Sequence, residues 1–268
     1  MQCERLPGPG ETILGGHFSR HPGGKGGNQA LAACRLGGDV SMIGCVGQDS
    51  EADAALELLD GAGVDLSRLE RMSDYPTGVA LIAVSAEGEN QIVVAPGANA
   101  EFKSEHLPER IEGALIGQLE IPVDTLLAAT QRTTGLVVLN LAPARDVPER
   151  LLERADVLVV NESEADFYGL DILHAFGGLV ALTLGAEGAV MYRDGKEVAR
   201  ARPPAVEAVD TTGAGDTFVA ALTVALLEEQ RPEKALAFAC AAGAASTLGA
   251  GAQTAVPDRE TADSLLAE

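Results

Sequence analysis

Short runs of β-branched and apolar residues alternate along the chain with longer segments in which apolar positions recur every three or four residues. The first pattern is typical of buried strands and the second of amphipathic helices. Four runs are expected to be core strands: Val40–Val46, Val137–Leu141, Val157–Val160 and Val180–Leu184. Four segments are expected to be helices: Asn28–Leu36, Ala52–Ala62, Thr217–Glu229 and Glu233–Leu248. This alternation predicts an α/β fold, a three-layer and mostly parallel sheet flanked by helices.

One region departs from the alternation and predicts a hairpin. Thr77–Val84 and Gln91–Ala95 are strand-like and are separated only by a short turn that contains glycine. The stretch Glu11–Phe18 is also strand-like and is bounded by glycine and proline. We expect these segments, about 5–21 and 76–96, to form a small β lid. No repeat, low-complexity tract or linker divides the chain, so the lid is expected to belong to a single domain that covers the whole sequence.

The charge balance limits the partners of the protein. The chain has 19 basic and 40 acidic residues, a formal net charge of −21, so its field repels nucleic acids and anionic lipid surfaces. Neither a cleavable leader nor an apolar run of membrane-spanning length is found in the sequence. The four cysteines lack C-x-x-C spacing, which fits reduced thiols. We therefore expect a cytoplasmic protein that binds neither nucleic acid nor membrane.

The strongest chemical signal is Val209–Phe218, a glycine-bearing turn that leads directly into a predicted helix. Gly213 and Gly215 allow backbone N–H groups to converge at the positive end of that helix, where an anion can bind. Asp216 lies at the same point. In an arbitrary sequence such a carboxylate is equally well explained as a helix cap. Phosphoryl transfer, however, needs a base for the acceptor hydroxyl beside an anion cradle, and this turn offers both.

A second glycine-rich turn, Pro22–Ala30, also opens a helix. It is not a P-loop, because Lys25 is followed by Gly26 instead of Ser or Thr, and it is not a dinucleotide fingerprint, because no strand precedes it. On its own it fits a flexible loop equally well. The glycines nevertheless allow a ligand to approach closely, with Lys25 and Asn28 as polar contacts.

Together, Gly23–Ala30 and Asp210–Phe218 resemble the two signature segments of the ribokinase-like (PfkB-type) carbohydrate kinases. Further matches follow in the same order along nearly the whole chain: Pro9–Thr12, Thr77–Leu81, Gly88–Asn90, Pro96–Ala100, Gln118–Glu120, Leu139–Arg145, Asn161–Glu164 and Thr183–Gly188. The match is closest to the ribose-phosphorylating members. The resemblance implies ATP-dependent phosphorylation of a sugar hydroxyl, with ribose as the leading substrate. Another pentose, a hexose, a deoxy sugar acid or a nucleoside stays open.

The resemblance also implies roles for individual residues. Asp216 would accept the proton of the sugar hydroxyl, and the backbone of Gly213, Ala214 and Gly215 would form the anion hole. Sugar hydroxyls would be bound by Gly24, Lys25, Asn28 and Glu120. ATP and its Mg²⁺ would be held by Asn161, Glu164, Thr183, Gly185, Ala186, Glu187, Gly188, Gly215 and Cys240. Without the resemblance, Asn161 and Glu164 fit a helix N-cap and a first-turn acid equally well.

The family also carries a loop for a monovalent cation, here K⁺, formed mainly by oxygen atoms. The matching positions are Asp210, Thr212, Ser246, Gly249 and Gly251. Ala255 stands where a serine hydroxyl is common, which weakens this expectation. His17 and His21 have the spacing of metal ligands only on a helix, and they lie in a region that reads as strand or loop, so we assign them no metal.

The predicted hairpin has apolar residues on both faces, Val79, Leu81 and Ala83 against Ala80, Ile82 and Val84. Such a hairpin is poorly suited to exposure, and a homodimer through the lid is expected.

Two features depart from the family. Its members carry a strand with an Asn-x-Asp sugar contact before the Pro9–Thr12 match, and only Met1–Pro7 precede that match here. In addition, Asp171–Gly178 is too short for a full crossover helix, so either the strand pairing tolerates a short connection or the chain is incomplete there. A catalytically impaired sugar- or nucleotide-binding protein is therefore the alternative to an active kinase.

Overall fold

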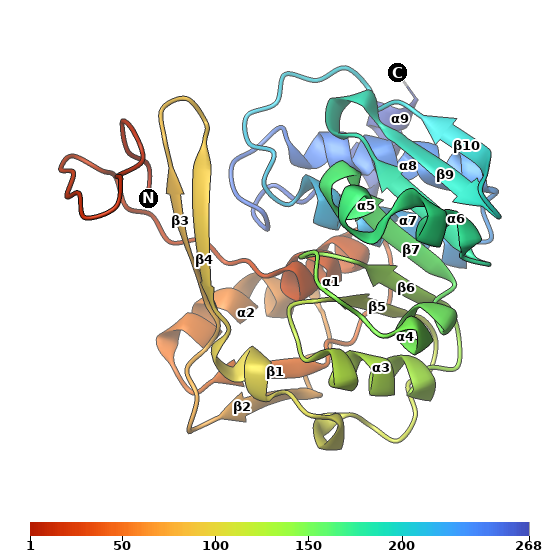
Figure 1. Ribbon diagram of the computed structural model, residues 1–268, viewed down its shortest axis with the longest axis horizontal. Coiled ribbons are helices and arrows are strands. Elements are labelled where there is room, and N and C mark those ends of the chain that lie inside the picture. Colours follow the sequence, from red (N-terminus) through yellow and green to blue (C-terminus); the bar gives the residue numbers. More distant parts are fainter. Residues whose placement is uncertain (268) are drawn as a thin grey trace.

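Parallel strands form the centre of the molecule in the computed structural model, which describes residues 1–267 (Figure 1). Within these residues, six strands form the main sheet in the order β10-β9-β8-β7-β6-β5. Four of them are parallel: β5 (Leu115–Gln118), β6 (Val137–Asn140), β7 (Val157–Asn161) and β8 (Leu179–Thr183). Two antiparallel strands complete the sheet: β9 (Ala189–Arg193) and β10 (Lys196–Ala201). The predicted α/β fold is confirmed as a mixed sheet flanked by helices.

Helices cover both faces of this sheet. One core cluster joins the sheet to α1 (Lys25–Arg35), α2 (Ser50–Ala62), α7 (Ala214–Leu227) and α8 (Pro232–Ser246). A second cluster joins the opposite face to α3 (Val123–Arg132), α4 (Glu149–Glu153), α5 (Glu162–Tyr168) and α6 (Leu170–Ala175). Successive strand residues point to opposite faces and both faces are buried, so the central strands are continuous apolar runs.

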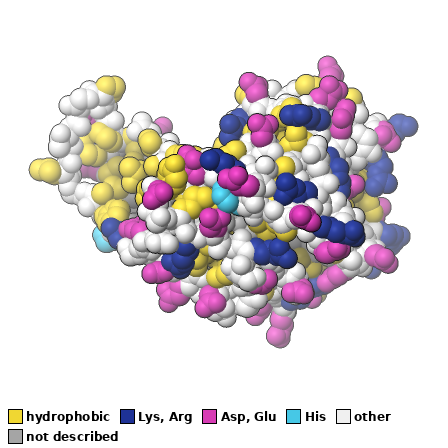
Figure 2. All heavy atoms as spheres, turned by 90° about the horizontal axis from the view of Figure 1, so that it is seen from below, with side chains coloured by type: hydrophobic (Ala, Val, Ile, Leu, Met, Phe, Trp, Pro, Cys, Tyr) yellow, Lys and Arg dark blue, Asp and Glu magenta, His cyan; other side chains and the backbone are white. Residues whose placement is uncertain are grey.

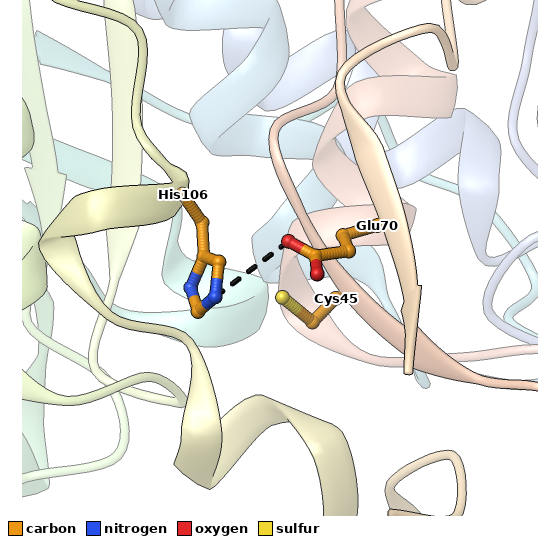
Figure 3. A group of neighbouring side chains, drawn as sticks. All are labelled: Cys45, Glu70 and His106. Carbon is orange, nitrogen blue, oxygen red and sulfur yellow. Dashed lines mark ion pairs between the residues drawn. The ribbon is translucent and has the colours of Figure 1, made fainter. Parts of the chain in front are cut away.

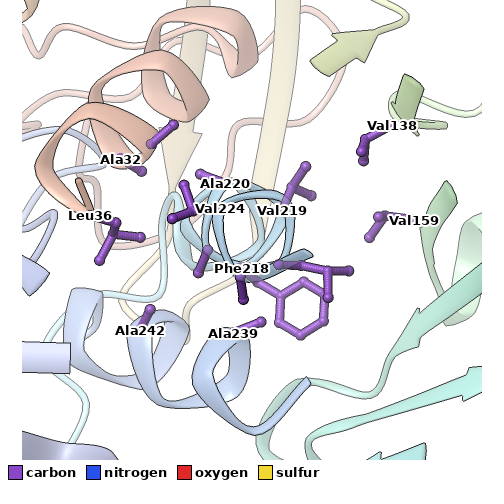
Figure 4. Close-up of a cluster of buried hydrophobic side chains, with 14 of the residues drawn as sticks. Ala32, Leu36, Val138, Val159, Phe218, Val219, Ala220, Val224, Ala239 and Ala242 are labelled. Atoms are coloured by element: carbon purple, nitrogen blue, oxygen red, sulfur yellow. The ribbon is translucent and has the colours of Figure 1, made fainter. Parts of the chain in front are cut away.

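Helix α7 lies in the middle of the first cluster, between α1 and α8 (Figure 4). Val138 and Val159 of the sheet face it, and Phe218 fills the space between α7 and α8. From Asp216 to Ala225 every residue of α7 is buried, so this part of the helix has no solvent-facing side. The burial of α7 holds its N-terminus in a defined position at the edge of the sheet.

A second, smaller parallel sheet consists of β1 (Gly44–Gly47) and β2 (Leu69–Met72). The predicted strand Val40–Val46 is therefore too long at its start, where only an isolated bridge at Ser41 is formed. Among residues 1–267, no strand pairs with both β1 and β5, so the two parallel groups stay separate. This arrangement agrees with the expectation that a central strand of the family is missing from this sequence.

The predicted hairpin is confirmed, with β3 (Val79–Val84) paired in antiparallel register to β4 (Asn90–Ala95). It projects from the body, and the N-terminal segment lies near its end (Figure 1). The strand expected at Glu11–Phe18 is wrong, since only an isolated bridge links His17 to Gln2. Gly15 has a φ of 91°, a left-handed conformation that interrupts an extended strand.

The short connection before β8 still gives a parallel pair. Helices α5 and α6 together bridge β7 and β8, and the register pairs Asn161 with Thr183. The first of the two alternatives for Asp171–Gly178, that the pairing tolerates a short connection, therefore holds.

The remaining elements are short. They are the C-terminal helix α9 (Arg259–Leu266) and three 3₁₀ turns, η1 (Gly97–Glu101), η2 (Ser104–His106) and η3 (Gly185–Glu187). None of the helices described in residues 1–267 has the length and apolar character needed to cross a membrane.

Candidate active site

Four polar residues end the parallel strands on one edge of the sheet. Gln118 and Asn140 end β5 and β6 and are register partners, and Asn161 and Thr183 end β7 and β8 and are also partners. Ligands of open α/β sheets bind at this carboxyl edge. The starts of α1 and α7 reach the same edge, because Asp216 contacts Asn28 and the neighbouring Gln29 contacts Asn140 at the end of β6. The candidate site is built where these strand ends and helix N-termini meet.

The N-terminus of α7 is suited to bind an anion. Gly213 begins the helix with a φ of 82°, and a Cβ atom there would lie 2.9 Å from Ala252 Cα, so glycine is required. No side chain caps the helix. In the part of the chain that the structure describes, the backbone N–H groups of Gly215 and Asp216 have no protein acceptor. The N–H of Ala214 already donates to Thr211 O at 3.2 Å. The N–H of Gly213 likewise has no acceptor among the described residues, so the free donors of the predicted anion hole are at 213, 215 and 216.

The carboxylate of Asp216 is 7% exposed and is held by the first turn of α1. Its Oδ2 accepts a hydrogen bond from Asn28 Nδ2 at 2.8 Å, and its Oδ1 accepts one from Gln29 Nε2 at 2.9 Å. Lys25 Nζ lies 4.0 Å from Oδ1. These contacts fix the orientation of the carboxylate within the site.

The residues predicted to bind the sugar surround this carboxylate. Glu120 Oε2 accepts a hydrogen bond from the Lys25 backbone N–H at 2.8 Å, and Gly24 has a φ of 88° beside it. Burial raises the pKa of Glu120, while the N–H and the charge of Lys25 oppose this shift. Asn28 Oδ1 is buried and has no partner within residues 1–267, so it is available to accept a hydrogen bond from a ligand hydroxyl.

Asn161 and Glu164 form a capping box at the start of α5. Glu164 N donates to Asn161 Oδ1 at 2.8 Å, and Asn161 N donates to Glu164 Oε2 at 2.9 Å. Burial raises the pKa of Glu164, and the charges of Lys25 and Asp216 also act on it, so Glu164 belongs to the same electrostatic environment as the site. The structural reading of this pair is therefore confirmed, and its role toward phosphates and Mg²⁺ stays a prediction.

The predicted nucleotide turn follows β8. Thr183 Oγ1 donates to Val160 O at 3.3 Å, and η3 supplies Gly185, Ala186 and Glu187. A Cβ atom on Gly188 would collide with the Ala201 carbonyl, which explains the glycine. Cys240 is different, since it is buried in α8 and burial raises the pKa of its thiol to about 12. It does not line an open surface, and its predicted nucleotide contact stays untested.

The predicted cation loop is assembled from two segments. Asp210 Oδ1 accepts a hydrogen bond from Thr212 N at 2.9 Å, and its Oδ2 accepts one from Gly251 N at 2.8 Å. Burial alone would raise the pKa of Asp210, but hydrogen bonds from Thr212 and Gly251 and the charge of His21 outweigh it and lower the pKa. Ser246 is buried and donates its hydroxyl to a carbonyl of its own helix, and Gly249 packs closely against the segment that follows Gly251. The segments around 210 and 250 therefore lie together.

Three amide side chains at the site had no assigned role in the sequence analysis: Gln29, Gln118 and Asn140. Gln29 donates to both Asp216 and Asn140, and it accepts from Gln118. One signal for Gln29 was present, namely two adjacent amides at the start of an otherwise Ala- and Leu-rich helix.

Outside this site, Cys45, Glu70 and His106 form a group whose residue types are those of metal ligands, but the hydrogen bond of His106 argues against a bound metal (Figure 3). The ligand atoms of Cys45, Glu70 and His106 all lie within 4.8 Å of one another. However, His106 Nδ1 accepts a hydrogen bond from Lys103 N at 2.8 Å. The ring proton is therefore assigned to Nε2, which faces Glu70 Oε2 at 3.6 Å. A protonated nitrogen cannot bind a metal, so the contact to Glu70 accounts for the group.

Comparison with known proteins places this site in a family. Residues 1–259 match the model of the pfkB family carbohydrate kinases. The chain is 40% identical to the ribokinase of Bacillus subtilis, over 99% of this chain and 94% of that protein. It is 37% identical to the ribokinase of Haemophilus influenzae, over 94% of this chain and 89% of that protein. The crystal structure of Thermotoga maritima ribokinase superposes with a TM-score of 0.90 at 33% identity, covering 100% of this chain and 95% of that one. The Arabidopsis thaliana ribokinase complexed with ribose and ATP superposes with a TM-score of 0.85 at 31% identity, covering 99% and 94%. The chain belongs to the pfkB family of carbohydrate kinases.

Proposed function

We propose that this carbohydrate kinase transfers the γ-phosphate of ATP to a hydroxyl of D-ribose and forms ribose 5-phosphate. One observation supports the chemistry most directly. The Asp216 carboxylate lies beside Lys25 and the uncapped N-terminus of α7, where the N–H groups of Gly215 and Asp216 are free. The choice of ribose is supported by the 37–40% identity to two ribokinases and by the bound ribose and ATP of the Arabidopsis relative.

The residues of the site suit the steps of this reaction. Asp216 accepts the proton as the sugar oxygen attacks the γ-phosphorus, and the N–H groups at 215 and 216 stabilise the charge of the transferring phosphoryl group. Glu120 and Asn28 offer acceptors to sugar hydroxyls. Phosphoryl transfer needs little covalent chemistry from the protein, so orientation and charge account for most of the rate enhancement.

Magnesium is part of the proposal. Mg²⁺ would neutralise the triphosphate when bound, because Lys25 is the one ammonium paired with the site in residues 1–267. Asn161 and Glu164 are the residues proposed to hold the phosphates and the metal's water shell. We propose K⁺ at the loop around Asp210 and Gly251, with a weak response because Ala255 supplies no hydroxyl.

The alternative, a binding protein with impaired catalysis, is favoured by the separation of β1 and β5 in the sheet. A missing strand at that point would remove a sugar contact and leave ATP binding intact. Retention of Asp216 and the free donors of α7 favours the enzyme, because a binding protein has no need of a base.

A substrate panel tests the proposal. Release of ADP by the purified chain is measured with ribose, other pentoses, hexoses, deoxy sugar acids and nucleosides, each with Mg²⁺ or with excess chelator. Ribose should give the highest kcat/KM, and the chelator should abolish the reaction. Replacing K⁺ by a bulky organic cation should lower the rate. A higher kcat/KM for another acceptor would identify that acceptor as the substrate in place of ribose. ATP binding without turnover on any acceptor would favour the binding protein with impaired catalysis.

A further inference from the structure

A buried amide, Gln29, connects the carboxylate of Asp216 to the ends of two sheet strands. Gln29 follows Asn28 in the first turn of α1 and is 1% exposed. Its Nε2 donates to Asp216 Oδ1 at 2.9 Å and to Asn140 Oδ1 at 3.1 Å. Its Oε1 accepts from Gln118 Nε2. Both donors of this amide and its carbonyl oxygen are therefore engaged within the protein.

The partners of Gln29 determine the orientation of its amide. A carboxylate offers only acceptors, so Nε2 must face Asp216 and Oε1 must face Gln118. Gln118 and Asn140 are register partners at the ends of β5 and β6, and Asn140 Nδ2 donates to the carbonyl of Val159 at 3.3 Å. The sheet thus holds the amide, and the amide holds one oxygen of the carboxylate.

The neighbouring Asn28 has a different role. It donates to the other oxygen of Asp216, Oδ2, and its own Oδ1 has no partner among residues 1–267. Asn28 can therefore rearrange toward a ligand, whereas Gln29 has no free group to offer one. The two carboxylate oxygens therefore differ: Oδ1 accepts a hydrogen bond from the amide that the sheet holds and has Lys25 Nζ at 4.0 Å, whereas Oδ2 accepts its hydrogen bond from Asn28, whose own oxygen is free.

We propose that Gln29 is a positioning residue for the phosphoryl transfer. It anchors Oδ1 of Asp216 so that Oδ2 is the oxygen that accepts the sugar proton. The inference rests on the proposed kinase function, but the contact on which it depends can be measured without any activity. A displaced carboxylate lowers the rate of the chemical step, because misplacement of a reacting group by about 1 Å costs on the order of 100-fold.

The variant Gln29→Met tests the proposal, since methionine has a similar length and offers no amide. We expect kcat to fall about 10- to 100-fold, with the KM for ATP within about twofold of the parent, because the loss affects the transition state and not nucleotide binding. Thr223→Val is the matched control. Thr223 is also buried and lies on α7, but its hydroxyl donates only to Val219 O of the same helix. This control loses a buried hydrogen bond and should keep the parent kcat.

Nuclear magnetic resonance provides a readout that does not depend on turnover. The side-chain amide signal of Gln29 is assigned by its loss in Gln29→Met. Asp216→Asn should change the chemical shift of this signal, because the amide then loses a charged acceptor. Thr223→Val should leave the chemical shift unchanged.

Two results would overturn the proposal: a kcat of Gln29→Met within threefold of the parent, or a Gln29 signal that does not respond to Asp216→Asn. If the parent shows no kinase activity while the signal responds, the proposed function fails and the Gln29–Asp216 contact stands.

Discussion

At the scale of single residues, the site depends on carboxylates held in a largely buried environment. Burial alone disfavours a charged carboxylate, and Glu120 and Glu164 both have a raised pKa for this reason. Asp216 lies among the same groups but accepts two amide hydrogen bonds and has Lys25 nearby. The proposed base is therefore the carboxylate of the site that two side-chain amides orient.

Glu164→Gln separates a structural role from a functional one. Glutamine can maintain the capping box with Asn161 but carries no charge for a metal's water shell. We expect kcat with Mg²⁺ and ATP to fall by about tenfold or more, as for residues that support a metal from its outer shell, while the protein stays folded. Steady-state kinetics and circular dichroism check this. Parent-like kcat would show that Glu164 serves only as a cap.

The same variant gives a prediction for the pH dependence of stability. Burial raises the pKa of Glu164 above its ordinary value of 4.5, so the folded protein holds this proton more tightly than the unfolded chain. The stability due to this group is present below the unfolded pKa and is lost as the pH rises through the raised folded pKa. The Tm of the parent minus the Tm of Glu164→Gln should therefore be largest at about pH 4 and should decrease toward about pH 7. A Tm difference that increases with pH would contradict the raised pKa of Glu164.

The sequence indicated only in part which residues meet at this site. Asp216, Lys25 and Glu164 could be predicted because they occur within recognisable local motifs. The network of Gln29 could not be predicted, because it brings together residues about 90 to 190 positions apart in the chain, and only the packing of α1, α7 and the sheet makes them neighbours.

At the scale of secondary-structure elements, the N-terminus of α7 can be tested with two glycines that differ in their surroundings. Gly213 has a φ of 82° and is packed against Ala252, whereas a Cβ atom on Gly215 meets nothing within 4 Å. We expect Gly213→Ala to lower the free energy of unfolding by about 1–3 kcal/mol. Gly215→Ala should fold as the parent does, but its methyl group would project into the proposed anion hole and lower kcat by about 100-fold.

Denaturant unfolding and steady-state kinetics of both variants check this prediction. Parent-like kcat in a folded Gly215→Ala would place the transferring phosphate elsewhere.

Sequence patterns predicted the buried elements well and the exposed ones less well. The central strands could be predicted because continuous burial on both faces requires continuous apolar runs, as in Val157–Val160. Glu11–Phe18 has a strand-like composition, but apart from the bridge at His17 it has no pairing partner in the structure. Composition alone cannot supply a partner, so an exposed segment of this kind is easily misassigned.

At the scale of the whole molecule, apolar surface is concentrated on the lid. Figure 2 shows apolar side chains gathered toward the end that carries the hairpin, while charged side chains are scattered over the rest of this face. Leu81 and Val93 are register partners in the hairpin and are each 66% exposed. A patch of this kind on an acidic protein is suited to a second apolar surface, and we propose a homodimer through the lid.

Light scattering at micromolar concentration should give twice the mass of one chain. Val93→Lys should give a monomer, because a charge in the centre of the contact cannot be desolvated without cost. Leu227→Lys is the control, since Leu227 is also exposed but lies at the end of α7 and is not part of the lid. A monomeric parent would contradict the proposed dimer.

The central claim is that Asp216 accepts the proton of a sugar hydroxyl. The most direct measurement is the rate of ribose-dependent ADP release by Asp216→Asn and by the parent, together with ATP affinity from calorimetry. Asparagine keeps the shape of the side chain and removes its ability to accept a proton. We predict a rate about 100- to 10,000-fold lower, with ATP affinity nearly unchanged. A rate within a few-fold of the parent would show that Asp216 is not the base.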